Sequence, residues 1–134
     1  MEAMKIESYL IDEYTSPCTV TASKEETVLE LMRKMGDHDV RHIPVVENNK
    51  AIGLVTERDL KLVINLATGR ALTADEVMIT EPFVVKPGEA LRDVVFEMSK
   101  RKVGSALVLD AECEDIGIFT STAALNALVE VLTA

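Results

Sequence analysis

Thr56 and Asp59 are the residues of this sequence whose types and spacing best fit binding chemistry. They stand three positions apart at the predicted start of a helix, directly after the apolar stretch Ile52 to Val55. Backbone amides at such a helix start favour an anionic phosphate, and an Asp carboxylate can accept hydrogen bonds from both hydroxyls of a ribose. The same Thr-x-x-Asp spacing is also that of a capping box, which only stabilises the helix start. On spacing alone the two interpretations carry equal weight.

Other side chains with chemical potential fit structural roles better. Ser23 and Glu26 have the capping-box spacing and no further feature, so they predict a helix cap. His38 stands between two Asp residues at a predicted helix end and is expected to be exposed. Several methionines lie on predicted core stripes and fill space rather than bind a metal; these are Met32, Met35 and Met98.

The composition excludes several classes of function. A formal net charge of −9, from 23 acidic and 14 basic side chains, repels polyanions such as nucleic acids at long range. No apolar run approaches the length of a membrane span. Cys18 and Cys113 are far apart and form no CxxC motif, which argues against a disulfide framework or a zinc site. We therefore expect a cytoplasmic protein that binds neither nucleic acid nor membrane.

An internal repeat supplies the elements that would position Thr56 and Asp59. In each half a short strand candidate follows a proline, at Cys18 to Val20 and at Phe83 to Val85. An amphipathic helix comes next, and its apolar positions match across the halves, since 91 minus 28 and 98 minus 35 both equal 63. Two strands and a second helix complete each half. The strands are expected at Ile43 to Val46, Ile52 to Val55, Ala106 to Leu109 and Ile116 to Phe119, and the second helices begin at Thr56 and Thr120.

This repeat predicts an α/β (α+β) fold of two tandem β-α-β-β-α units. The first repeat is expected at residues 8–68, a linker at 69–76 and the second repeat at 77–134. Because neither unit alone can cover both faces of so short a sheet, the copies are expected to pack face to face as a module with pseudo-two-fold symmetry. Clefts between the copies are the expected ligand sites.

The strings RHIPVV, from Arg41 to Val46, and IGLVTERDL, from Ile52 to Leu60, resemble the signature of a CBS (cystathionine beta-synthase) domain. A second, weaker copy begins at Val77, so roughly residues 8 to 132 resemble a stand-alone CBS pair, or Bateman module. The resemblance implies a non-catalytic regulatory module that binds an adenosine-containing ligand between its repeats and signals occupancy to a partner protein. AMP, ADP or ATP is the implied ligand, with S-adenosylmethionine or NAD as alternatives, and no cofactor is obligatory.

The family pattern also implies roles for single residues. Asp59 would hold the ribose, and Thr56 and Arg58 would address the phosphate. Arg41 and His42 stand where the family often has basic residues that face ligand phosphates, although a solvated Arg and a surface His are as plausible. The opposite repeat would supply the base slot, which is lined by Phe83, Val103, Gly104, Ser105 and Ala106. Val103 and Ala106 also fit ordinary strand packing.

Two features of the sequence bear on how many nucleotides bind and on which nucleotide binds. The second copy has Ala123 where the first has Asp59, so it lacks the ribose acceptor, and a lost buried hydrogen-bonding partner costs about 1–3 kcal/mol. We therefore expect one competent nucleotide site per chain. The negative net charge favours AMP or ADP over ATP, depending on how many basic side chains reach the phosphates; the candidates are Arg41, His42, Arg58, Arg101 and Lys102.

The sequence fits three classes of function to different degrees. A nucleotide sensor fits the repeat and its single intact motif. An enzyme is disfavoured, because the sequence has no nucleophile with a base beside it, no P-loop and no GxGxxG string. A protein-interaction scaffold without ligand stays open, given the lost Asp. The last helix, from Ala123 to Ala134, is apolar nearly all round, which predicts a homodimer.

Overall fold

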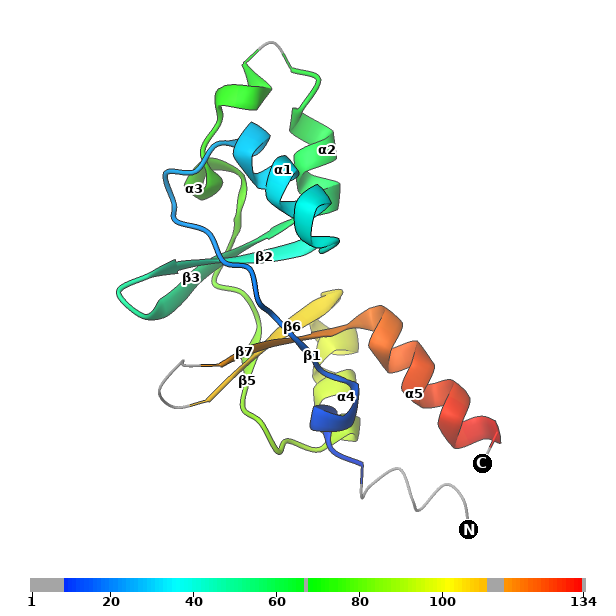
Figure 1. Cartoon of the computed structure of the whole chain (residues 1–134). Coiled ribbons are helices and arrows are strands. Elements are labelled where there is room, and N and C mark those ends of the chain that lie inside the picture. The colour runs from blue at the N-terminus through cyan, green and yellow to red at the C-terminus, as the bar shows by residue number, and fades with distance from the viewer. Residues whose placement is uncertain (1–8, 67, 111–114, 134) are drawn as a thin grey trace. The chain divides into compact units, whose positions relative to one another are not determined.

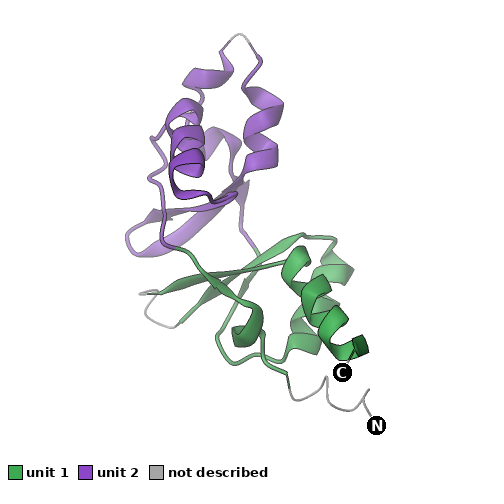
Figure 2. Cartoon of the chain, turned by 45° about the vertical axis from the view of Figure 1, so that its right-hand side comes forward, with its two compact units in different colours: residues 1–18, 83–134 green, residues 19–82 purple. Residues whose placement is uncertain are grey.

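The computed structural model describes residues 9–66, 68–110 and 115–133. The chain divides into two compact units, drawn in green and purple in Figure 2. Unit 1 comprises residues 1–18 and 83–134, and unit 2 comprises residues 19–82. Each unit has a hydrophobic core of its own.

Unit 2 contains the three-stranded antiparallel sheet β2-β3-β4 and the helices that pack on it. Figure 1 shows helices α1 and α2 above this sheet. The elements of unit 2 are α1 (Val28–His38), β2 (His42–Glu47), β3 (Lys50–Thr56), α2 (Glu57–Val63), the 3₁₀ turn η3 (Gly69–Ala71), α3 (Ala74–Val77) and β4 (Ile79–Thr80).

The hairpin of unit 2 fixes the register of its two longest strands. Asn48 and Asn49, the two residues between β2 and β3, both have positive φ, of 51° and 63°. Asn tolerates this left-handed conformation, and two-residue turns of this kind match the twist of the strands. The resulting register places His42, the first residue of β2, opposite Thr56, the last residue of β3. The beginning of β2 therefore lies beside the beginning of α2.

Unit 1 contains the four-stranded sheet in the order β1-β7-β6-β5, in which only the β5/β6 pair is parallel. Helices α4 and α5 contribute Val94, Met98 and Ala127 to its core, beside the fully buried Phe119 of β7. The elements of unit 1 are the 3₁₀ turn η2 (Ile11–Tyr14), β1 (Ser16–Pro17), β5 (Val84–Val85), α4 (Leu91–Arg101), β6 (Ser105–Leu109), β7 (Ile116–Thr120) and α5 (Ser121–Thr133).

Residues 9–18 precede the first repeat's helix in sequence but pack within unit 1. The Ile11 amide donates to the Glu89 carbonyl at 3.0 Å, and the Leu91 amide donates to the Tyr9 carbonyl at 2.9 Å. Residues 69–82 likewise belong to unit 2, where the Val28 amide donates to the Leu72 carbonyl at 2.8 Å. Unit 1 is therefore built from two separate segments of the chain, whereas unit 2 is one consecutive stretch. The predicted repeat limits follow the similarity between the two halves of the sequence and do not coincide with the limits of the two compact units. The segment predicted as a linker, residues 69–76, forms η3 and part of α3.

The α/β class and the strand–helix–strand–strand–helix order predicted from the repeat are confirmed. The strand predicted at Cys18 to Val20 is wrong, because the chain instead pairs at Ser16–Pro17, with Ser16 opposite Ile118. β1 is an edge strand, and an edge position accommodates a proline without an N–H. Val20 is buried without belonging to a strand.

Among the described residues, no helix has the length and apolar character needed to cross a membrane. Cys18 is half-buried at the end of the N-terminal segment of unit 1. The second cysteine of the sequence, Cys113, lies outside the described residues.

The burial of Ile11 predicts that the N-terminal segment stabilises unit 1. Ile11 is fully buried in the core, whereas its neighbour Leu10 is 41% exposed. Ile11→Ala is expected to lower the free energy of unfolding by about 2–5 kcal/mol, because it leaves a cavity in a packed core. Leu10→Ala is the matched control, with an expected loss below about 1 kcal/mol. Equal urea midpoints for the two variants, measured by circular dichroism, would contradict the packing described above.

Candidate functional site

Thr56 sits at the junction of β3 and α2 and is the N-cap of α2. Its hydroxyl oxygen accepts a hydrogen bond from the Asp59 amide at 3.2 Å and donates to Asp59 Oδ2 at 2.9 Å. The Thr56 half of the predicted capping box is therefore present, whereas the Asp59 carboxylate reaches the Thr56 hydroxyl and not the backbone. The Asp59 carboxylate bonds to the Thr56 hydroxyl through one oxygen, which fixes its orientation. Both residues are half-buried.

Arg41 and His42 lie beside this junction within unit 2. The Glu57 amide donates to the Arg41 carbonyl at 2.9 Å, and His42 pairs with Thr56 across the hairpin. Arg58 follows on the first turn of α2. The structure thus gathers the sequence-predicted residues of the first repeat in one place, and two of them, Arg41 and Arg58, are exposed cations.

His42 is half-buried, and this burial lowers the pKa of its imidazole below the ordinary value of 6.5. The neighbouring Arg41 lowers the pKa further, while Glu57 acts in the opposite direction. The ring is therefore largely neutral at pH 7, so the permanent positive charges among these predicted residues are those of Arg41 and Arg58.

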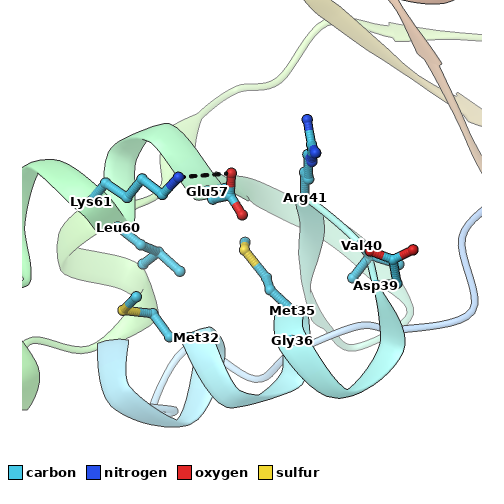
Figure 3. Close-up of a pocket in the computed structure, with 9 residues that line it drawn as sticks. All are labelled: Met32, Met35, Gly36, Asp39, Val40, Arg41, Glu57, Leu60 and Lys61. Carbon is cyan, nitrogen blue, oxygen red and sulfur yellow. Dashed lines mark ion pairs between the residues drawn. The ribbon is translucent and has the colours of Figure 1, made fainter.

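A cavity of about 220 Å³ opens between α1 and α2 next to this cluster. Figure 3 shows its apolar floor of methionine side chains and the Lys61–Glu57 ion pair, with an N–O distance of 3.3 Å, on its rim. Its lining residues are Met32, Met35, Gly36, Asp39, Val40, Arg41, Glu57, Leu60 and Lys61. The cavity shares Arg41 with the predicted site but includes neither Thr56 nor Asp59. It is also smaller than typical small-molecule pockets, which occupy about 300–1,000 Å³.

The residues predicted to line the base slot lie in unit 1. The Phe83 carbonyl accepts a hydrogen bond from the Leu107 amide at 2.8 Å, and the Gly104 carbonyl accepts one from the Ser121 amide at 2.9 Å. A Cβ atom added at Gly104 would have Ser121 Oγ, at 3.9 Å, as its nearest contact, so the backbone there is open. Ala106 is buried in the sheet, as its packing role predicts. The strand packing predicted for Val103 is wrong, because Val103 is 37% exposed and precedes β6. Ser105 is half-buried.

The corresponding junction in unit 1 has lost the carboxylate. Thr120 still caps the helix, since the Ala123 amide donates to its hydroxyl oxygen at 3.1 Å. A polar cavity of about 450 Å³ lies alongside, lined by Glu13, Tyr14, Thr15, Ser16, Thr120, Thr122, Ala123, Asn126 and Glu130. The Tyr14 hydroxyl donates to Glu130 across it, and this hydrogen bond raises the pKa of Tyr14 to about 12. Among the described residues, the lining of this cavity offers hydroxyls and carboxylates and no Lys or Arg side chain.

The Ser23–Glu26 interpretation needs a correction. The Ser23 amide donates to Glu26 Oε2 at 2.8 Å, but the helix starts later, with Thr27 as the N-cap of α1. Thr27 and Glu30 form the reciprocal capping box. The Thr-x-x-Glu spacing was present in the sequence and identifies the true helix start, four residues after the predicted one.

Two β-α-β-β-α repeats, each with a threonine-capped second helix, define a tandem α/β module. A family model described as "CBS domain" matches residues 11–65 and again residues 74–130. The chain therefore belongs to the CBS domain family and carries two copies of the domain.

Curated relatives share this region over part of their length. Inosine-5′-monophosphate dehydrogenase of Escherichia coli (strain K12) is 30% identical over 122 residues, which are 89% of this chain and 24% of the dehydrogenase. The dehydrogenase of Korarchaeum cryptofilum is 27% identical over 117 residues, 87% of this chain and 23% of that protein. The chain thus spans about a quarter of the length of these dehydrogenases, and the similarity runs through their CBS region. CBS domain-containing protein YhcV of Bacillus subtilis is 33% identical over 92 residues, 67% of this chain and 65% of YhcV.

Solved structures show the same fold. The CBS domain pair of protein MJ0100, in complex with 5′-methylthioadenosine and S-adenosylmethionine, has a TM-score of 0.79 and 22% identity, covering 91% of this chain and 97% of that one. The CBS domain of a bacterial CNNM/CorC family Mg²⁺ transporter, in complex with ATP, has a TM-score of 0.81 and 20% identity, covering 96% and 92%. CBSX2 in complex with AMP has a TM-score of 0.72 and 20% identity, covering 92% and 98%.

Proposed function

We propose that this chain is a non-catalytic regulatory module that binds an adenosine-containing nucleotide and signals its occupancy to a partner protein. The observation that carries the proposal is the Asp59 carboxylate, oriented by Thr56 beside the two exposed arginines Arg41 and Arg58. Three structural relatives were solved with adenosine ligands, which supports the class of ligand. The activity of the related dehydrogenases is not part of the proposal.

The proposed roles follow the chemistry of each group. Asp59 accepts hydrogen bonds from the ribose hydroxyls, because the Thr56 hydroxyl uses only one lone-pair position of its carboxylate. Arg58 and Arg41 bind phosphate, since a guanidinium donates two parallel hydrogen bonds to such a group. His42 adds a hydrogen-bonding ring beside them. The base is proposed to contact the residues of unit 1 already described, namely Phe83, Val103, Gly104 and Ser105.

The number of available cations favours AMP or ADP over ATP as the ligand. Arg41 and Arg58 are the exposed cations among the residues of the first repeat proposed for the site. In unit 1, Arg101 is engaged by Glu97 at 2.9 Å, which reduces its availability for a phosphate chain. A triphosphate would therefore bring more negative charge than these groups neutralise, on a chain whose net charge is −9. S-adenosylmethionine and NAD remain the alternative ligands, and a scaffold without ligand is the alternative function.

One nucleotide per chain is the proposed stoichiometry. The junction in unit 1 has Ala123 in place of the ribose acceptor, and the residues around it include the carboxylates of Glu13 and Glu130. No Lys or Arg lines that cavity, so a phosphate there would meet negative charge alone.

The ribose role of Asp59 predicts a large and specific loss of affinity. Asp59→Ala is expected to weaken AMP binding at least tenfold by isothermal titration calorimetry, because two charge-assisted hydrogen bonds, worth roughly 1.5–3 kcal/mol each, are lost. Asp37→Ala is the control, since it removes an equal charge from an exposed position on α1. Unchanged affinity in Asp59→Ala would leave that residue with no role beyond its bond to Thr56. A ligand that binds the folded protein raises its melting temperature. If AMP, ATP, NAD and S-adenosylmethionine all leave the melting temperature unchanged, the scaffold function is favoured over the nucleotide sensor.

We also propose that two copies of the chain associate through α5. Of this helix only Ala127 is buried, whereas large apolar side chains lie on its surface. Leu125 is 61% exposed, Val129 is 58% exposed and Leu132 is 74% exposed. Soluble monomers seldom leave such a contiguous apolar surface uncovered, and closed two-fold pairing is the commonest way to cover one. Leu62 and Leu66, exposed at and after α2, are candidates for the same interface.

The proposed association predicts a dimer in solution. The wild-type chain is expected to sediment at twice the monomer mass of 14.7 kDa in analytical ultracentrifugation. Leu125→Glu or Leu132→Glu should yield monomer or insoluble protein, because a buried unpaired charge is costly at an interface. Thr133→Glu adds the same charge elsewhere on α5 and should remain dimeric. A wild-type monomer at high micromolar concentration would rule the interface out.

A further inference from the structure

Glu57 places a carboxylate among the residues that are proposed to bind the phosphate. Its amide donates to the Arg41 carbonyl at 2.9 Å, and the next residue along α2 is Arg58. The charge of Glu57 also reaches the first residue of β2, because it opposes the lowering of the His42 pKa. A carboxylate at this place repels a phosphate and attracts the same guanidinium groups that a phosphate needs.

Lys61 pairs with this carboxylate. Lys61 Nζ lies 3.3 Å from Glu57 Oε1, one helical turn further along α2, and Figure 3 shows this ion pair beside the cavity between α1 and α2. A glutamate four residues before a lysine is the favourable order for such a pair on a helix. Because the Lys61 side chain is 66% exposed, the pair contributes little to the stability of the fold. The pair matters more for the negative charge of Glu57, which it partly neutralises.

Arg41 is the other cation of the same cavity. Arg41, Glu57 and Lys61 all line it, as Figure 3 shows. Within the described part of the chain, the exposed Arg41 guanidinium forms no ion pair. If the Lys61 side chain were removed, Arg41 would be the remaining cation of the lining, and the Glu57 carboxylate would compete with a phosphate for it.

We propose that Lys61 is a positioning residue of the nucleotide site, which holds the Glu57 carboxylate and so keeps Arg41 available to the phosphate of the ligand. This inference rests on the proposed nucleotide function and deepens it, because it adds a residue that acts on phosphate affinity without contacting the ligand. Glu57 is the internal competitor of the phosphate, and Lys61 neutralises it. All three side chains belong to unit 2.

Loss of Lys61 is expected to weaken the binding of a phosphate-bearing ligand alone. Lys61→Ala should weaken AMP binding about two- to fivefold in calorimetry at low salt, the size expected for one exposed charge pair. Adenosine, which has no phosphate, should bind the variant and the wild type alike in an NMR titration. Lys61→Arg keeps the cation and should restore AMP binding. Lys24→Ala is the matched control, because it removes an equal charge from another ion pair of unit 2, with Glu47 at 2.8 Å, and should bind AMP like the wild type.

A double-mutant cycle with Glu57→Gln decides whether Lys61 acts through Glu57 or attracts the phosphate itself. In the Glu57→Gln background, Lys61→Ala should no longer weaken AMP binding, because no competing carboxylate is left at position 57. Asp39, the second carboxylate of the cavity lining, is present in every variant and cancels in the comparison. An equal loss in both backgrounds, an equal loss for AMP and adenosine, or no loss at all in Lys61→Ala overturns the inference. Absence of AMP binding by the wild type would instead reject the proposed function, on which the role of Lys61 depends.

Discussion

The Thr56 hydroxyl makes two hydrogen bonds to one residue, accepting from the Asp59 amide and donating to the Asp59 carboxylate. These bonds start α2 at the end of β3 and orient the Asp59 carboxylate. The register of the β2/β3 hairpin brings Arg41 and His42 to the same point. A helix cap and a ribose acceptor are therefore compatible uses of the same residues, and the two interpretations of the sequence do not exclude each other.

The second repeat shows what remains when the acceptor is lost. Thr120 caps α5 as Thr56 caps α2, so the helix start survives without a carboxylate at Ala123. The helix cap thus depends on the threonine hydroxyl, whereas the proposed ribose binding depends on the Asp carboxylate. The residues around Thr120 also differ from those around Thr56. The cavity beside Thr120 is lined by Glu13 and Glu130, and its described lining residues include no basic side chain. We propose that the first repeat carries the polar contacts to the ligand.

The sequence predicted those parts of the fold that depend on local pattern. The apolar stripe of α1, at Val28, Leu31 and Met35, and the strand–turn–strand that follows it could be predicted because periodicity and turn residues are local signals. The packing of residues 9–18 within unit 1 could not, since a buried residue such as Ile11 does not indicate which partner covers it. Within the site, the residue types at Thr56 and Asp59 were informative. The Arg101 guanidinium lies 4.5 Å from the centroid of the Phe83 ring, and this contact between residues eighteen positions apart left no signal in the sequence.

We propose that Asp59 binds the ribose hydroxyls of an adenosine ligand, and a ligand that lacks those hydroxyls tests this role. Calorimetry compares AMP with 2′,3′-dideoxy-AMP on the wild type and on Asp59→Ala. We predict that removing the hydroxyls weakens binding to the wild type at least about tenfold, as expected for lost charge-assisted hydrogen bonds. In Asp59→Ala the two ligands should bind alike. A loss of equal size in the wild type and the variant would contradict the account, because the hydroxyls would then bind elsewhere.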